Sequence, residues 1–141
     1  MPDQAVFDRG AIENTLNRYS IAYDENDMAE MADTFTDDAV FTMRIADGDL
    51  IGPFEGKEAI MKLMVDSHAS QTDQRRHVTT NLAVRHADDK TASVSSYLTL
   101  ISVENGAAKL LSTARYDDEL RRCDDGEWRF TKRHIQLDLP Y

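Results

Sequence analysis

The sequence of 141 residues is poor in residues that would indicate cross-links or an irregular chain, with one cysteine, three prolines and six glycines. A single cysteine, Cys123, excludes an internal disulfide, and its polar surroundings favour a free thiol on an exposed turn. Basic residues are also scarce, with 16 Lys and Arg against 26 Asp and Glu and a formal net charge of −10. Because such a surface repels phosphate groups and anionic lipids, we expect neither nucleic acid nor a membrane as a partner.

Long hydrophobic runs are missing as well. The apolar stretches are only a few residues long, which is too short to span a membrane. Residues 1–8 contain neither a basic start nor an apolar run, so we expect no signal peptide and a cytoplasmic location. Hydrophobic residues nevertheless make up 41% of the chain, enough for a core. Without repeats or linkers, residues 1–141 are predicted to form one domain.

Helical spacing of apolar residues marks the first half of the chain. Asp8–Asp24 is predicted to be a helix, because one apolar stripe runs along it. That stripe consists of Ile12, Leu16, Tyr19 and Tyr23. Asp27, with Glu30 three residues later, resembles a capping box and predicts a second, short helix that buries Phe35 at its end. A third helix is predicted over Lys57–Ser67.

The second half of the chain changes to the period of two that strands show. The predicted strands are Arg76–Arg85, Thr91–Val103, Ala108–Arg122 and Glu127–Asp138. Tight turns between them predict an antiparallel meander, and a further strand at Ala39–Ile45 is followed by a short return at Leu50–Ile51. Helices followed by strands predict an α+β fold, with the helices packed on one face of a curved sheet. Such a sheet can curl into a cone whose mouth is a ligand pocket.

Two residues stand out as candidates for chemistry. Asp24 ends the predicted first helix, where a carboxylate faces the negative end of the helix dipole at a cost of about 0.3–1 kcal/mol. The alternative to a chemical role is that Asp24 helps to form the loop that follows the helix. Strict alternation places His77 opposite the most apolar face of its strand. Either the strand is bulged near Thr79 and Thr80, or both faces are covered, or His77 is exposed.

The remaining polar motifs are weaker. His86 lies in a turn, whereas His68 at a helix end and His134 in the last strand are candidates to line a pocket. No metal-binding spacing and no glycine-rich phosphate loop occur, so we expect neither a metal nor a cofactor. Acid–base chemistry without a cofactor remains.

Five motifs carry a resemblance to a known family. They are Tyr19–Asp24, Phe35–Phe41, Gly56–Ile60, Arg76–Asn81 and Asp125–Phe130. Together they extend over about the whole chain and are typical of SnoaL-like domains of the nuclear-transport-factor-2-like superfamily. The resemblance implies the cystatin-like fold, a cone-shaped α+β barrel whose curved antiparallel sheet packs on three N-terminal helices.

Within the superfamily, the chain is most similar to the branch of scytalone dehydratase, bile-acid 7α-dehydratase and hexachlorocyclohexane dehydrochlorinase. This resemblance implies that Asp24 orients His77, which acts as the general base of a cofactor-free elimination. Tyr23 matches the pocket tyrosine beside the aspartate. One position departs from the pattern: scytalone dehydratase has a second histidine on the following strand, where this chain offers Tyr97.

The hypothesis is therefore a cofactor-independent lyase, dehydratase, isomerase or cyclase that acts on a small, apolar, cyclic substrate. Neutral His77 would take a proton from carbon, and a tyrosine or arginine would donate to the developing oxyanion or leaving group. The candidate substrate-binding residues are Tyr23, Tyr97, Tyr116, Arg115, Phe41 and Met64.

Two other functional classes stay open. The chain resembles the β subunits of ring-hydroxylating dioxygenases, which implies a non-catalytic binding or accessory domain, and the same fold also carries epoxide hydrolysis. A buried contact between Asp24 and His77 would favour the enzyme, and an exposed or unpaired His77 the accessory domain. We expect a homodimer through the outer face of the sheet, with a trimer as the alternative.

Overall fold

The first part of the fold is helical, and most of the sheet follows it in the sequence. The computed structural model describes residues 8–141. The expectation that there is no signal peptide concerns residues 1–8, and residues 1–7 lie outside the described part. The helices are α1 (Arg9–Asp24), α2 (Met28–Asp33) and α3 (Lys57–Ala69). The strands are β1 (Phe35–Ile45), β2 (Ile51–Glu55), β3 (Gln74–Ala87), β4 (Thr91–Glu104), β5 (Ala107–Arg122) and β6 (Trp128–Leu137). Among residues 8–141, no helix is long and apolar enough to cross a membrane.

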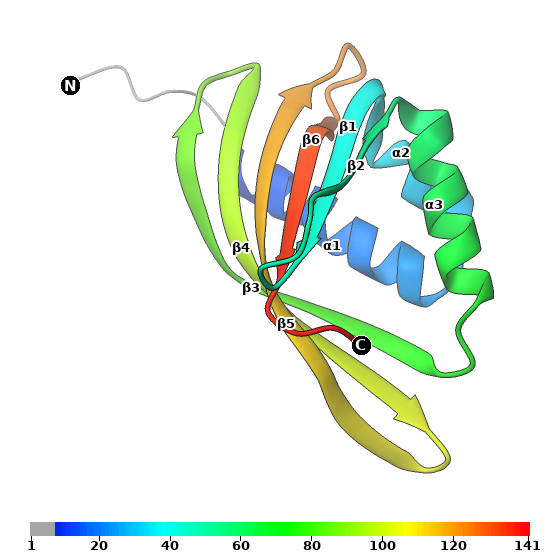
Figure 1. The fold of residues 1–141 in the computed structure, drawn as a ribbon. Helices are drawn as coiled ribbons and strands as arrows, with labels where there is room; N and C mark the ends of the chain where they lie inside the picture. Colours follow the sequence, from blue (N-terminus) through cyan, green and yellow to red (C-terminus); the bar gives the residue numbers. More distant parts are fainter. Residues whose placement is uncertain (1–7) are drawn as a thin grey trace.

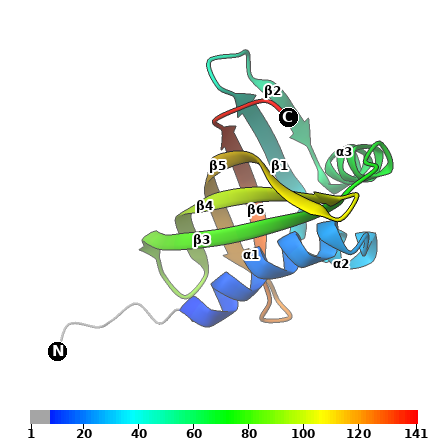
Figure 2. The same cartoon turned by 90° about the horizontal axis from the view of Figure 1, so that it is seen from below.

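All six strands form one curved sheet in the order β2-β1-β6-β5-β4-β3. The predicted meander of β3 to β6 is confirmed, since consecutive strands pair antiparallel. β1 joins β6 in parallel, and β2 closes the other edge. The sheet wraps around α1, while α3 lies beside β1 and β2 (Figures 1 and 2). The α+β class and the cone-shaped arrangement predicted from the sequence are thus confirmed.

The start of β1 differs from the prediction. Phe35 was expected to end the second helix, but that helix ends at Asp33, and Phe35 is the first residue of the strand. It pairs with Phe130 of the parallel neighbour β6 and is fully buried. Local spacing could not show this, because the partner strand lies more than ninety residues further along the chain.

α1 covers the free edge of the sheet that β3 would otherwise expose. Arg9 donates to the carbonyl of Leu82 at 2.8 Å, near the first turn of the helix. The hydroxyls of Ser20 and Thr79 are 3.1 Å apart further along. An open strand edge offers unpaired backbone groups to other chains, and a helix laid along it removes that liability.

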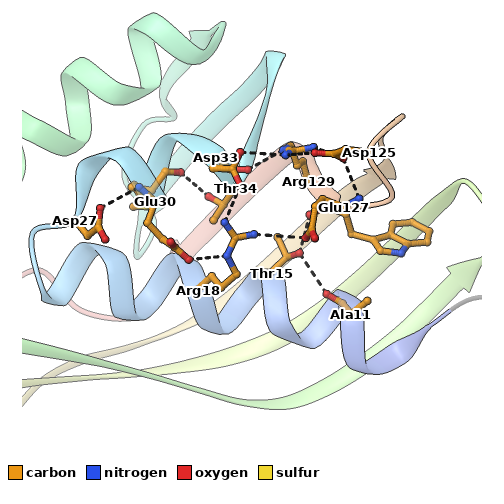
Figure 3. Close-up of polar contacts among 12 residues, drawn as sticks. Ala11, Thr15, Arg18, Asp27, Glu30, Asp33, Thr34, Asp125, Glu127 and Arg129 are labelled. Atoms are coloured by element: carbon orange, nitrogen blue, oxygen red, sulfur yellow. Dashed lines mark hydrogen bonds and ion pairs between the residues drawn. The ribbon is translucent and has the colours of Figure 1, made fainter.

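A network of ion pairs joins α1 and α2 to the turn between β5 and β6 (Figure 3). Arg18 binds Glu30 at 2.7 Å and Asp33 at 2.8 Å. Asp33 also binds Arg129, which in turn binds Asp125 at 2.8 Å. The two arginines hold the pKa of the Asp33 carboxyl below its usual value, first of all through the hydrogen bond from Arg18. This end of the fold is therefore held by charges from three separate segments.

The interior contains a second ion pair, between Arg133 of β6 and Asp118 of β5. Both side chains are fully buried, and Arg133 Nε lies 3.0 Å from Asp118 Oδ1. The guanidinium carbon is 3.6 Å from the centre of the Tyr116 ring, 4.2 Å from that of Tyr19 and 4.5 Å from that of Phe130. Burial raises the pKa of Asp118 to about 7, against the lowering influence of Arg133. The three aromatic rings around the guanidinium offset part of the cost of burying its charge.

We expect Arg133→Met to lower the free energy of unfolding by about 3–5 kcal/mol, because it leaves the Asp118 carboxyl buried without its cation. The double variant Arg133→Met/Asp118→Leu should regain most of this loss, since both polar groups are then gone. Urea denaturation measures both variants, with Arg122→Met at the exposed end of β5 as the control. Equal losses in the single and double variants would show that the pair itself is not what matters.

Candidate active site

Asp24 at the end of α1 and His77 in β3 lie in direct contact. Asp24 Oδ1 is 2.6 Å from His77 Nδ1, and Oδ2 accepts the backbone N–H of the same histidine at 2.8 Å. The two side chains are only 7% and 11% exposed. A carboxylate accepts hydrogen bonds but does not donate them, so Nδ1 carries the ring proton and Nε2 is left as the basic nitrogen.

His77 points into the cone because β3 contains a bulge. Before the bulge, His77 pairs with the buried Leu100, and after it Val84 pairs with the buried Val94. The register shifts between Thr80 and Ala83, where Asn81 adopts a left-handed conformation with φ 58°. The extra residue brings His77 and Val84 to one face although strict alternation separates them. Of the three possibilities raised by the sequence, the bulge is the one that occurs.

Asp24 is held in place by the end of α1 and by contacts with the sheet. Gln74 Nε2 at the start of β3 donates to the Asp24 carbonyl at 2.9 Å. The chain turns directly afterwards, at Asn26, which has φ 56°. A carboxylate at this end of a helix is disfavoured by the dipole, and the two N–H groups of His77 offset that cost.

An apolar cavity of about 70 Å³ lies in front of His77, between α1, α3 and the inner face of the sheet. Its wall includes the side chains of Tyr19, Tyr23, Phe41, Met64, Leu98 and Tyr116. Of the residues predicted from the sequence, Tyr23, Phe41, Met64, His77 and Tyr116 are therefore brought together. Asp24 lies behind His77 and reaches the cavity only through it.

Tyr23 packs against the histidine ring from the side. The two ring centres are 5.0 Å apart at an interplanar angle of 66°. The Tyr23 hydroxyl is 2.8 Å from Ser67 Oγ in α3 and accepts a hydrogen bond from Gln71. Burial raises the pKa of Tyr23, so the ring stays neutral. These contacts leave the His77 imidazole little room to turn.

Tyr116 lines the cavity and carries a buried hydroxyl that is not already engaged. The residue is fully buried, and its hydroxyl has no hydrogen-bond partner within residues 8–141. Burial raises the pKa of Tyr116 far above its ordinary value, which keeps the phenol protonated. A protonated phenol at an apolar wall is a hydrogen-bond donor for a ligand oxygen.

Tyr97 and Arg115 are not brought to the cavity. They are cross-strand neighbours on the outer face of the sheet, where Tyr97 is 54% exposed and Arg115 pairs with Asp117 at 3.0 Å. Inward positions on β4 have even numbers, such as Leu98 and Leu100, so Tyr97 points outward. This placement contradicts their role as substrate-binding residues.

The remaining histidines lie outside the lining of the His77 cavity. His134 is on the outer face and makes a 2.8 Å hydrogen bond to Thr42. His68 meets the edge of the Tyr23 ring with the centres 5.5 Å apart, and His86 is exposed. Within residues 8–141, no three His, Cys, Asp or Glu side chains gather closely enough to hold a metal.

The cavity residues that the sequence did not indicate include Ser67, Arg75 and Tyr141. The signal for Arg75 was available, because it lies two residues before His77 on one strand and therefore shares its face. Ser67 ends the helix predicted over Lys57–Ser67, but helical periodicity indicates only the apolar face of that helix. Tyr141 follows the last strand, and no local pattern indicates where it lies.

Comparison with known proteins identifies the family and the fold. Residues 4–134 match the SnoaL-like domain family. The chain belongs to this family. The match extends over most of the sequence and confirms the resemblance carried by the five motifs. No curated protein matches the SnoaL-like chain significantly.

Solved structures share the fold over nearly the whole SnoaL-like chain. A protein from Novosphingobium aromaticivorans described as an aromatic ring hydroxylase is 30% identical, with 94% of this chain and 90% of that one covered and a TM-score of 0.77. A protein from Catenulispora acidiphila, solved in complex with S-DNPA, is 27% identical, with 91% of each chain covered and a TM-score of 0.77.

A third structure shows the fold alone. It is described as the β subunit of an aromatic-ring-hydroxylating dioxygenase from Novosphingobium aromaticivorans and is 15% identical to the SnoaL-like chain. The alignment covers 94% of this chain and 90% of that one, with a TM-score of 0.80. The fold is therefore shared by proteins with different descriptions, and function has to be argued from the site.

We expect nitrogen-15 NMR of the histidine side chains to show His77 as the tautomer protonated at Nδ1. Asp24→Leu should abolish that preference, because the carboxylate that accepts the Nδ1 proton is gone. Asp88→Asn, beside the exposed His86 at 3.9 Å, is the matched control and should leave the His77 signals unchanged. An Nε2-protonated His77 in the native protein would contradict the assignment.

Proposed function

We propose that this protein is a cofactor-independent acid–base enzyme, a lyase, isomerase or cyclase, that removes a proton from carbon in a small cyclic substrate. The observation that carries the proposal is the buried contact between Asp24 and His77 beside an apolar cavity. A general base needs a free nitrogen at the substrate and a fixed orientation. The contact supplies both, since Asp24 occupies Nδ1 and leaves Nε2 for the reaction.

In the proposed reaction, Nε2 of neutral His77 takes the proton, and the electron pair of the C–H bond moves into the substrate. There it forms an enolate, or expels a leaving group from the neighbouring carbon. Asp24 stabilises the imidazolium that results. The low polarity of the cavity strengthens this interaction, because little water competes for the charges.

Tyr116 is the proposed donor to the oxyanion. It lines the same cavity as His77, and its buried hydroxyl has no partner within the described residues 8–141. A donor that is already placed where negative charge develops stabilises the transition state without reorganisation. Arg133, stacked on the Tyr116 ring at 3.6 Å, adds a positive charge behind the phenol.

The alternatives are less well supported by this geometry. For an accessory domain we predicted an exposed or unpaired His77, whereas the His77 side chain is only 11% exposed and is bound to Asp24. Epoxide hydrolysis needs carboxylates that activate water, and no Asp or Glu lines the cavity in the part of the chain that is described. The description of one similar structure, an aromatic ring hydroxylase, names an aromatic ring, which supports a cyclic substrate.

A homodimer and a cytoplasmic location stay predictions. The outer face of the sheet carries exposed apolar side chains from three adjacent strands, including Val78, Tyr97, Val103 and Leu110. A face of this kind is suited to a two-fold contact between copies of the chain.

The base is tested by hydrogen exchange at carbon, with 2-tetralone in D₂O as the carbon acid and NMR as the readout. We expect the protein to catalyse exchange of the ring protons next to the carbonyl. His77→Gln should remove this catalysis, and Asp24→Asn should reduce it about 10²–10⁴-fold, because the tautomer is no longer fixed. Tyr97→Phe, on the outer face, is the control and should exchange at the native rate. Full activity in His77→Gln would disprove the proposed base.

The same assay tests Tyr116. Tyr116→Phe keeps the ring and removes only the hydroxyl, so we expect the exchange rate to fall about 10²–10³-fold while the fold is retained. Circular dichroism and thermal unfolding check the fold. An unchanged exchange rate in this variant would show that the oxyanion is stabilised elsewhere.

A further inference from the structure

The cavity at His77 and a second hollow have one lining residue in common, Arg75. The second hollow, which we call the outer cleft, has a volume of about 360 Å³ and is lined largely by polar residues. They include Asp73, Ser102, Glu104 and Lys109. Arg75 lines both hollows, and within the described chain it is the one Lys or Arg side chain in the wall of the His77 cavity.

Arg75 and His77 share one face of β3 at a short and fixed separation. They are two residues apart on the same strand, so their Cα atoms are about 7 Å apart. The Arg75 side chain is only 16% exposed. A cation that is largely buried beside an apolar cavity is costly unless something offsets its charge. Its partners therefore decide what the residue does.

Arg75 is already held in position by its neighbours. Asp73 Oδ2 accepts the Nε proton at 2.8 Å, and the Ser102 hydroxyl donates to the same oxygen. The Tyr141 ring flanks the guanidinium, with its centre 5.0 Å from Cζ. The hydrogen bond to Asp73 uses Nε, and a guanidinium has four further N–H groups, on Nη1 and Nη2. Such an arrangement fits the two oxygens of an incoming carboxylate.

We propose that Arg75 binds an acidic group of the substrate, so that the substrate is an apolar ring that carries a carboxylate arm. This rests on the proposed function and specifies its substrate class. The ring occupies the cavity against His77, and the arm extends past Arg75 into the outer cleft, where Lys109 adds a second positive charge. The carboxylates of Asp73 and Glu104 line the same cleft and balance these two charges, so the guanidinium N–H groups that Asp73 does not use are what recognises the carboxylate.

The proposal is tested by binding, with 3-phenylpropionate and its neutral amide, 3-phenylpropionamide, as the two compounds. Calorimetry on the native protein should show tighter binding of the acid, by about tenfold or more, as expected for a charge-assisted pair. Arg75→Gln should lower the affinity for the acid to that for the amide, and the affinity for the amide should stay unchanged. Arg75→Lys, which keeps the charge, should retain part of the preference.

Arg76→Gln is the matched control. Arg76 is the next residue of the strand, is half exposed and binds Glu25 at 2.8 Å outside the cavity. This variant should keep the native preference for the acid. Equal affinity of the two compounds for the native protein, a preference that survives in Arg75→Gln, or no binding of either compound would each overturn the proposal.

The result of the binding experiment does not depend on catalysis. His77→Gln should still prefer the acid, because Arg75 and the outer cleft are unchanged in it. If no carbon acid is exchanged by the native protein but the acid preference depends on Arg75, the proposed function fails and the anion site stands. If exchange depends on His77 but binding is indifferent to the carboxylate, the anion site alone is wrong.

Discussion

The contact between Asp24 and His77 is the interaction on which the rest of the site depends. Asp24 uses one oxygen for the imidazole and the other for the backbone N–H of the same residue, so it fixes the ring and the strand together. The strand is the free edge of the sheet, and its N–H would otherwise lack a partner. One carboxylate therefore completes the sheet edge, anchors α1 and sets the tautomer of the base.

The polar groups of the interior are arranged in two layers around this contact. His77 borders the cavity with Asp24 behind it, whereas Asp118 and Arg133 lie behind the Tyr116 and Tyr19 rings. Tyr116 separates the two layers, because its ring packs on the guanidinium and the residue also lines the cavity. Burial of an ion pair in this way stabilises little by itself, but it places positive charge next to the position assigned to the oxyanion.

Much of the fold could be predicted because its signals are local. The apolar stripe of Ile12, Leu16, Tyr19 and Tyr23 is buried as expected, and turn residues such as Asn105 and Gly106 lie between strands that pair antiparallel. Phe35 is a residue whose position local signals could not predict. Its place in β1 depends on parallel pairing with Phe130, and no pattern around residue 35 contains that information.

The α+β class, the family and the choice of Asp24 and His77 as candidates follow from the sequence, because motifs and periodicity lie within short stretches. The direction in which each side chain points follows only from the folded sheet. A single extra residue at Asn81 brings Val84 to the same inner face as His77, while Tyr97 and Arg115, chosen for their chemistry, point outward. The period of a strand is two, so one bulge reverses every face that follows it. Arg75 joined the site for the same reason, because facing follows from register and bulges, not from residue type.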